Sequence, residues 1–260
     1  MCWLEWVGQI GDATSEYRES PVRVISGISS IAAGSNHSLA ISDDEDLYSW
    51  GENAYGQLGG GSRKNRGRPV KVMVGVKAVA AGYGHTLALT HAEQVLSWGY
   101  NDEGQLGDGS FEARGWPIEI LTGIQAIAVG NLHSMALTNE GKVLCWGRNN
   151  QGQLGDGQQD ASTRPEQVLE DVIAIAAGEY HSLALTCTGD VLSWGWNKMG
   201  QLGDGSRKTQ ERPVKVLSGA TAIAAGEFHS LALIQESGGV WAWGLNNIGQ
   251  LGDGSLEERD

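Results

Sequence analysis

The chain has 260 residues, and its 31 acidic against 18 basic side chains give a formal net charge of -13. This excess of negative charge argues against a general nucleic-acid-binding function, because such proteins hold phosphates with clustered Lys and Arg side chains. The 39 glycines and 10 tryptophans predict many tight turns and a core rich in one aromatic residue, and they argue against a long helical bundle.

The N-terminal residues have neither a basic segment nor a sustained apolar stretch, and no run of 18 apolar residues occurs in the chain. We therefore expect no signal peptide and no transmembrane segment, which predicts a cytoplasmic location, with a nuclear location as the alternative. The cysteines Cys2, Cys145 and Cys187 lack any CxxC spacing. Neither a disulfide framework nor a cysteine-rich zinc site is expected.

An internal repeat of 48 residues runs through the chain. A Gly-Gln-Leu-Gly segment begins at Gly56, Gly104, Gly152, Gly200 and Gly249, and a weaker Gly-Gln-Ile-Gly begins at Gly8. A histidine three residues after a glycine recurs at His37, His85, His133, His181 and His229. The prolines are Pro21, Pro69, Pro117, Pro165 and Pro213, and Trp-Gly pairs begin at Trp50, Trp98, Trp146, Trp194 and Trp243. So many markers in one register indicate a repeat architecture.

We interpret the unit from Pro213 to Gly252 as four short strands, with the sequences PVKVL, TAIAAG, HSLALI and VWAWG. The proline suits the start of a strand or an edge strand, because it cannot donate a ladder hydrogen bond. Each stretch is too short and too rich in β-forming residues for a helix. The sequence therefore predicts an all-β fold, a β-propeller of about five four-stranded antiparallel blades.

The segment AGEYHSLALTCTGDVLSWGWNKMGQLGDGS, residues 177–206, resembles the repeat of the regulator of chromosome condensation family. The resemblance covers residues 21–255 and rests on the combined AG-x-x-H-S/T, W-G-x-N and G-Q-L-G pattern. It implies a seven-bladed ring, which at this repeat length needs about 336 residues. The chain holds only about five units.

We predict a single propeller domain over residues 1–260, with two architectures open. In the first, strands within residues 21–51 pair with the terminal strand from Val240 onward and close a five-bladed ring. In the second, the chain is an incomplete arc of a seven-bladed ring, and its unprotected blade edges self-associate. Residues 3–12 weakly duplicate the segment that ends at Asp253, which favours the arc, since a closed ring has no use for two copies of one edge.

The repeated polar residues offer two possible metal sites. A ring of histidines could hold a metal, and the aspartates of the Leu-Gly-Asp-Gly turns resemble a calcium loop. Each histidine follows a turn glycine, however, so we expect its ring to bond a neighbouring backbone group, and Asn and Asp suit turns. We predict no metal and no cofactor. The chain has no GxSxG, HExxH or P-loop pattern, so we also predict that it is not an enzyme.

Three segments between the Gly-Gln-Leu-Gly turn and the proline differ from unit to unit, at residues 62–68, 110–116 and 206–212. Equivalent positions in the repeat place them as loops on one propeller face, where binding residues are often carried by a rigid scaffold. The candidate partner-binding residues are Arg63, Lys64, Arg66, Arg68, Phe111, Trp116, Arg207 and Lys208. The basic ones predict a protein partner with an acidic surface, and the aromatic ones suit anchors. Solvated loops without a partner are the alternative.

We therefore predict a non-catalytic protein–protein interaction scaffold. The alternative, implied by resemblance to the founding family member, is a guanine-nucleotide exchange factor for a Ran-type small GTPase. Exchange in that protein depends on a β-wedge inserted in one blade, and this chain has no insertion longer than one residue. It also lacks a basic tail, which disfavours chromatin binding. The scaffold is the favoured reading.

Overall fold

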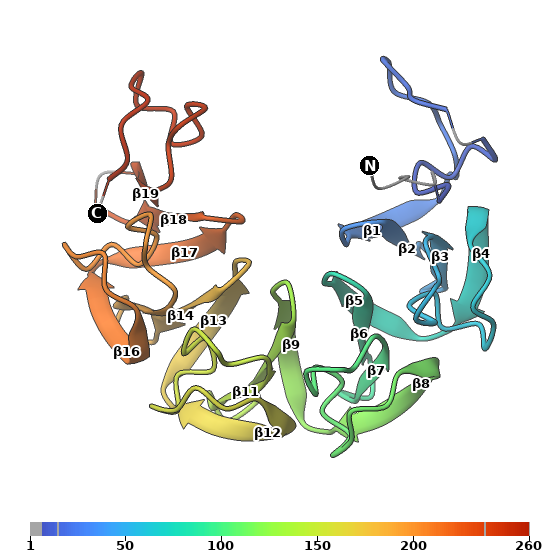
Figure 1. Ribbon diagram of the computed structural model, residues 1–260, viewed down its shortest axis with the longest axis horizontal. Coiled ribbons are helices and arrows are strands. Elements are labelled where there is room, and N and C mark those ends of the chain that lie inside the picture. The colour runs from blue at the N-terminus through green and yellow to red at the C-terminus, as the bar shows by residue number, and fades with distance from the viewer. Residues whose placement is uncertain (1–6, 15, 237, 260) are drawn as a thin grey trace. The chain divides into compact units, whose positions relative to one another are not determined.

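The computed structural model describes residues 7–14, 16–236 and 238–259, and over these residues the protein is all-β. None of the described segments is a helix long and apolar enough to cross a membrane. The strands form antiparallel sheets in which neighbours along the chain are neighbours in the sheet (Figure 1). The chain divides into two compact units.

The first unit contains residues up to Asp102 together with Ser110–Gly123. Its first sheet has the order β1-β2-β3-β4, and the strands are β1 (Ile28–Ala33), β2 (His37–Ser42), β3 (Leu47–Gly51) and β4 (Arg66–Met73). Its second sheet has the order β5-β6-β7-β8, and the strands are β5 (Val76–Ala81), β6 (His85–Thr90), β7 (Val95–Gly99) and β8 (Arg114–Leu121). Each sheet is a four-stranded meander, as the sequence predicts.

The second unit contains the loop Glu103–Gly109 and the chain from Ile124 onward. The strands of its first sheet are β9 (Ile124–Val129), β10 (His133–Thr138), β11 (Val143–Gly147) and β12 (Ser162–Leu169). Those of its second sheet are β13 (Val172–Ala177), β14 (His181–Thr186), β15 (Val191–Gly195) and β16 (Gln210–Leu217). The third sheet has three strands, β17 (Ala220–Ala225), β18 (His229–Ile234) and β19 (Val240–Gly244).

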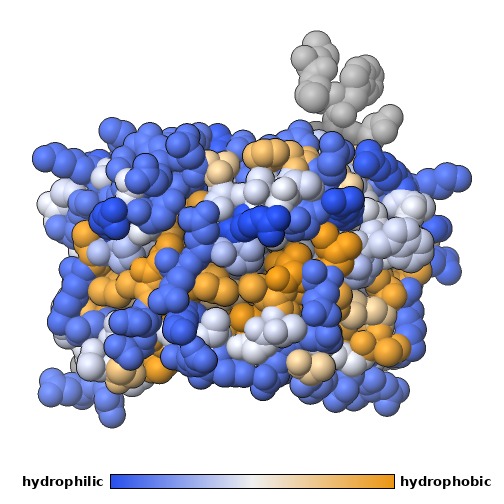
Figure 2. Space-filling model, turned by 90° about the horizontal axis from the view of Figure 1, so that it is seen from below, coloured by the Kyte–Doolittle hydropathy of each residue, from blue (hydrophilic) through white to orange (hydrophobic). Residues whose placement is uncertain are grey.

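The hydrophobic core lies between successive sheets of each unit. In the first unit Leu39, Ile41 and Leu47 of one sheet pack with Trp98 of the next. In the second unit Met135 and Leu137 pack in the same way with Trp194. Within the units, Trp98, Trp194 and Trp243 therefore fill the interface between neighbouring blades, as a large rigid apolar side chain does well. Figure 2 shows hydrophobic residues along the middle of one face and hydrophilic residues along both margins.

The grouping of strands into blades differs from the sequence prediction in one respect. The strands that contain Pro69, Pro117, Pro165 and Pro213 do not open a sheet with the strand that follows them. Each is the fourth strand of the preceding sheet, so that β16, which contains Pro213, pairs with β15. The proline strand returns along the Trp-Gly strand after a long loop, at the sheet's outer edge. A proline is tolerated at such an edge because its missing donor would face away from the ladder.

Residues 28–51 form three strands of one complete sheet, β1, β2 and β3, whose fourth strand is β4. Of the described residues, only Arg259 bridges β19 on its outer edge, through an isolated contact with Gly244. The corresponding pair in the preceding blade, Gly195 with Gln210, is the first pair of a full fourth strand.

Candidate protein-binding surfaces

A repeated hydrogen-bond network links neighbouring blades within each unit. The Gln57 backbone oxygen accepts hydrogen bonds from the Thr86 hydroxyl and from the Trp98 indole N–H, at 3.0 and 2.8 Å. The same pair of bonds recurs at the oxygens of Gln9, Gln105, Gln153 and Gln201. We call the loop around each of these glutamines the glutamine loop. The bonds of Gln105 with Ser134 and Trp146 attach the loop Glu103–Gly109 to the second unit.

The repeated histidines belong to this network. His133 Nε2 lies 3.0 Å from the Ser182 hydroxyl of the next blade, and His37 and His181 have the equivalent partners Thr86 and Ser230. Because the Ser182 proton is donated to the Gln153 oxygen, His133 donates through Nε2 and is neutral. Burial lowers the pKa of His133 to about 4. The partner is a side-chain hydroxyl, not the backbone group that the sequence analysis expected.

The repeated Asn and Asp side chains hold the loops after each Trp-Gly pair. The Asn53 amide donates to the Ser62 and Lys64 backbone oxygens, and its own oxygen accepts from Leu58 N. Asp204 accepts from Ser206 N, which makes a short side-chain turn. Among the described residues no group of three or more His, Cys, Asp or Glu side chains is placed to hold a metal ion. The Asn and Asp side chains therefore stabilise the loops.

The basic cluster, which we define as Arg63, Lys64, Arg66 and Arg68, lies in the first unit and all four side chains are exposed. Arg63 and Lys64 are in the loop, whereas Arg66 and Arg68 belong to β4 and, two residues apart, share one side of that strand. Arg66 and Arg68, together with Ala13, line a shallow hollow of about 360 Å³. None of the four side chains is ion-paired with another described residue.

The predicted aromatic anchors take different positions. Phe111 is in the loop before β8 and is 55% exposed. Trp116 is within β8, not in a loop, and is 64% exposed. Its ring lies across Gly61, where any side chain would collide with it. Trp116 therefore packs on the Gly61 backbone and still presents most of its surface to solvent.

Arg207 and Lys208 lie in the second unit, in the loop before β16, and both are exposed. Arg207 forms an ion pair with Glu258. Its charge is partly neutralised within the chain, so this pair of residues is a weaker candidate than the basic cluster. An exposed ion pair of this kind also contributes little to stability.

A further surface in the second unit escaped the sequence analysis, and we call Arg148, Tyr180, Trp196 and Phe228 the aromatic cluster. The Arg148 guanidinium lies 5.6 Å from the Tyr180 ring centroid. Trp196 contacts Tyr180 and Phe228 edge-on, with centroids 6.2 and 5.4 Å apart. Arg148, Tyr180 and Trp196 border a hollow of about 270 Å³. Trp, Tyr and Arg are the residue types that most often dominate binding energy.

Acidic groups lie beside the aromatic cluster. Glu179 accepts a hydrogen bond from the Asn131 amide at 2.8 Å. Partial burial, together with the neighbouring carboxylate of Glu227, raises the pKa of Glu179. The only available sequence signal is that the residue after each Trp-Gly pair varies, since the five residues are Glu52, Tyr100, Arg148, Trp196 and Leu245. In the first unit the Tyr100 ring contacts the rings of Tyr55 and Tyr83, with centroids 4.5 and 6.2 Å apart.

The sheets, their interlocking loops and the repeated tryptophans define a β-propeller repeat protein. The RCC1-like domain model matches residues 74–260, and two models of the regulator of chromosome condensation (RCC1) repeat match residues 44–89 and 28–57. The chain belongs to the regulator of chromosome condensation family. No curated protein sequence is significantly similar to it.

Solved structures of this family are similar to the chain over most of its length. Human WBSCR16 has 25% identity and a TM-score of 0.79, with 89% of this chain and 65% of that chain covered. Yeast RCC1 (Prp20) bound to Kap60 has 26% identity and a TM-score of 0.77, with 89% and 59% covered. Prp20p from Saccharomyces cerevisiae, whose structure was described with its binding to Gsp1p and histones, has 27% identity and a TM-score of 0.78, with 89% and 61% covered. The chain spans about three fifths of the length of these relatives.

Proposed function

We propose that the chain is a non-catalytic protein-binding module, and that its basic cluster contacts an acidic surface of a protein partner. The observation that carries the proposal is the contrast between repeated and variable positions. The repeated Trp, His, Asn and Gln side chains are largely buried and hydrogen-bond to backbone groups or hydroxyls of the fold. By contrast, Arg63, Lys64, Arg66 and Arg68 are exposed and unpaired among the described residues. Such a division is typical of a scaffold that carries binding residues.

Electrostatics supports the choice of partner. The chain carries a formal charge of -13, so a cluster of four cations stands out against the rest of its surface. Like charges placed close together repel one another, and an opposing acidic surface relieves that repulsion. A guanine-nucleotide exchange function has less support, because the repeat contains no insertion longer than one residue.

The test begins with affinity capture from a lysate of the source cells, with the intact chain and with a chain in which residues 62–68 are replaced by Gly and Ser. A partner that binds only the intact chain is purified, and its association rate is measured over a series of salt concentrations. In the double variant Arg63→Glu and Lys64→Glu we expect slower association and a weaker dependence on salt, because electrostatic steering acts mainly on the association rate.

The matched control is the double variant Lys77→Glu and Lys198→Glu, which changes the net charge by the same amount at two exposed lysines outside the cluster. It should leave the association rate close to that of the unmodified chain. If the two double variants slow association equally, net charge alone is responsible and the basic cluster is not the binding site. If neither has an effect, the aromatic cluster becomes the preferred surface.

A further inference from the structure

We propose that the hollow of the aromatic cluster binds an arginine side chain of a protein partner. This hollow of about 270 Å³ lies in the second unit and is lined by Arg148, Tyr180 and Trp196 together with two polar side chains. The site is separate from the basic cluster and takes the opposite charge. It depends on the proposed function only in that the partner is a protein.

The rings that line the hollow are fixed by the fold. Tyr180 lies in the turn between β13 and β14, Trp196 follows β15, and both side chains are half-buried. Their rings meet edge-on, with centroids 6.2 Å apart. The sheet that carries them packs on a neighbouring sheet of the same unit on each side. The position of the two rings is therefore set within the unit and does not depend on either end of the chain.

The chain itself places a guanidinium over one of these rings. Arg148 Cζ lies 5.6 Å from the Tyr180 ring centroid. Its Nε donates to the Asn150 side-chain oxygen at 2.9 Å and lies 3.8 Å from a Glu103 carboxylate oxygen. The negative face of an aromatic ring attracts a cation, and Arg is the cation found most often in such contacts. The contact of Arg148 with Tyr180 therefore shows which kind of group the rings of this hollow accept.

Two carboxylates stand beside the rings, and we call Glu179 and Glu227 the acidic pair. They directly precede Tyr180 and Phe228 in the sequence. The Glu179 backbone N–H donates to the Glu227 backbone oxygen at 3.1 Å, which places the two residues side by side in neighbouring blades. Among the described residues neither carboxylate forms an ion pair with a Lys, Arg or His side chain. The acidic pair therefore lacks a cation.

The acidic pair is connected to the hollow through Tyr180. The ring of Tyr180 lines the hollow, and a hydrogen bond joins its hydroxyl to Glu179. Partial burial first, and the neighbouring Glu227 carboxylate as well, raise the pKa of Glu179, because both disfavour its charged form. With Glu103, three carboxylates here face the single guanidinium of Arg148. A second cation would offset the excess negative charge.

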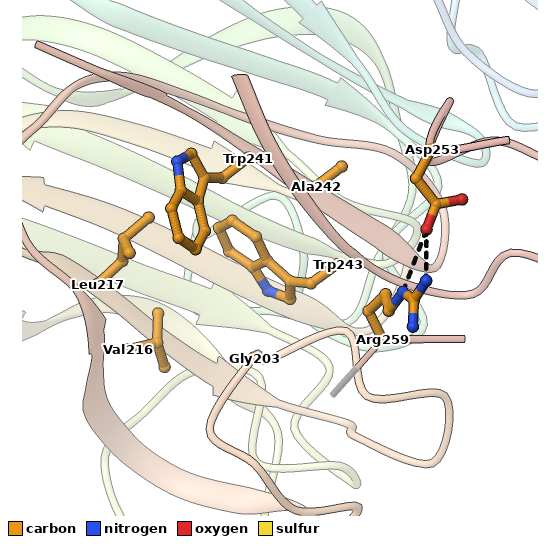
Figure 3. Close-up of a pocket in the computed structure, with 8 residues that line it drawn as sticks. All are labelled: Gly203, Val216, Leu217, Trp241, Ala242, Trp243, Asp253 and Arg259. Atoms are coloured by element: carbon orange, nitrogen blue, oxygen red, sulfur yellow. Dashed lines mark hydrogen bonds and ion pairs between the residues drawn. The ribbon is translucent and has the colours of Figure 1, made fainter. Parts of the chain in front are cut away.

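Another hollow of the second unit shows the same combination completed within the chain. Figure 3 shows the Trp241 and Trp243 rings on one side of that hollow and Asp253 with Arg259 on the other. The Asp253 carboxylate accepts from the Arg259 guanidinium at 2.9 Å. The aromatic cluster has rings and carboxylates of this kind, but its acidic pair has no guanidinium.

The chemistry favours an arginine over a lysine as the missing cation. A guanidinium is planar, stacks on aromatic faces and is less strongly hydrated than an ammonium group. It also binds carboxylates through two parallel N–H groups. A hollow with aromatic walls beside two adjacent carboxylates uses all of these properties. A lysine would use only the charge.

Binding of a minimal ligand tests the site without any partner of the basic cluster, so a negative result leaves the proposed function unaffected. The probe is N-acetyl-arginine-N-methylamide, compared with its lysine and citrulline counterparts. The readout is the Trp196 indole N–H resonance in NMR spectra, assigned with Trp196→Phe. We expect a saturable shift with a dissociation constant of about 1 mM for the arginine probe, as suits so small a ligand.

The comparison probes decide what the hollow recognises. Citrulline has nearly the shape of arginine without its charge, so it should cause no saturable shift, and the lysine probe should bind more weakly than the arginine probe. Equal binding of arginine and citrulline would overturn the role of charge. Equal binding of arginine and lysine would overturn the choice of a guanidinium. No shift with arginine would overturn the site.

A matched pair of variants tests the acidic pair. Glu227 lies in the turn before β18 and Glu236 in the turn after it, and both are exposed. They are therefore at opposite ends of one strand, about 20 Å apart. Glu227→Gln should raise the dissociation constant of the arginine probe about fivefold, whereas Glu236→Gln should leave it unchanged. An equal effect of both variants would show that net charge alone attracts the probe.

The variant Arg148→Gln distinguishes this site from an anion site. If the hollow takes a cation, loss of the Arg148 charge removes a repulsion and frees the Tyr180 ring face, so the arginine probe should bind more tightly. N-acetyl-glutamate-N-methylamide should cause no shift in the unmodified chain. Saturable binding of this glutamate probe that is lost in Arg148→Gln would overturn the proposal in favour of an anionic ligand.

Discussion

The indole N–H of Trp98 donates to the backbone oxygen of Gln57, 41 positions earlier in the chain, at 2.8 Å. That one bond joins the loop of one blade to the third strand of the next, and the same oxygen also accepts the Thr86 hydroxyl. Burial of the indole and satisfaction of its only donor occur together, which is the condition for placing Trp in a protein core. The interface between blades therefore depends on a side chain from one blade and a backbone atom from the other.

This arrangement predicts the effect of removing one tryptophan. Trp146 is 0% exposed and donates to the Gln105 oxygen. Trp146→Ala should lower the free energy of unfolding by about 3–5 kcal/mol, as other large-to-small core changes do. Urea unfolding measures the loss, with the exposed Asp160→Ala as the control. Equal midpoints for the two variants would mean that burial of Trp146 does not stabilise the fold.

Two glycines with positive φ allow a test of how closely the chain packs against the Trp146 indole. A Cβ added at Gly107, whose φ is +77°, would lie 2.8 Å from Trp146 Nε1, whereas at Gly123, whose φ is +71°, it would meet nothing within 4 Å. Both Gly→Ala changes incur the strain of a left-handed conformation, about 1–2 kcal/mol. Gly107→Ala should be more destabilising than Gly123→Ala in thermal unfolding. A similar loss in both would show that only backbone strain matters.

Acid should weaken the fold through its buried histidines. The pKa is lowered to about 4 in His37 and His133 and to about 3 in His181, first of all by burial. The unfolded chain takes up these protons near pH 6.5. The stability that depends on these neutral histidines is therefore fully present above pH 6.5. It is lost as the pH falls from there towards 4, because the unfolded state binds more protons than the folded state in that range.

The variant His133→Gln removes one of these histidines, so its contribution to the pH dependence can be measured by difference. Between pH 7.5 and pH 5 the unmodified chain should lose about 2 kcal/mol more stability than this variant, the amount expected for one histidine that cannot be protonated in the fold. Urea unfolding at the two pH values provides the four free energies. An equal loss in both proteins would indicate that His133 is protonated without cost in the folded state.

The two cysteines of known environment should differ in reactivity. Cys145 is buried in β11, and burial raises the pKa of its thiol, whereas Cys187 is exposed. In a Cys2→Ser chain a maleimide reagent should label Cys187 rapidly and Cys145 only after unfolding, because the thiolate is the reactive form. Mass spectrometry of peptides after labelling measures both rates. Rapid labelling of Cys145 at neutral pH would show that the interface around it opens readily.

The sequence predicted the four-stranded sheets and the structural role of the repeated residues, because each is tied to a spacing of 48 positions. The spacing did not reveal where a blade begins, since a period has no starting point. We grouped Pro213 with the strand that follows at once, whereas hydrogen bonding joins it to β15 across the intervening loop. For the same reason Arg66, Arg68 and Trp116 were expected in loops and lie in strands.

The aromatic cluster could not have been predicted, because its members come from segments that meet only in space. Tyr180 lies in the turn between β13 and β14, Trp196 follows β15, and Arg148 follows β11. No two are adjacent in the sequence, and each belongs to a position that varies from blade to blade. The hydroxyl partner of each repeated histidine was missed for a related reason, since Ser182 is 49 positions after His133.

The glutamine loops make the contacts between blades directional along the chain. Each blade receives its acceptor oxygen from the residues before it, so a truncation that removes Gln9 would leave Ser38 and Trp50 without their acceptor. A truncation after Gly244 would leave Trp243 still bonded to Gln201. Truncation at the N-terminus should therefore destabilise the fold more than truncation at the C-terminus. A whole repeat of 48 residues, by contrast, contains one hydroxyl and one indole donor and one glutamine acceptor oxygen. Its duplication or deletion therefore leaves no donor without an acceptor.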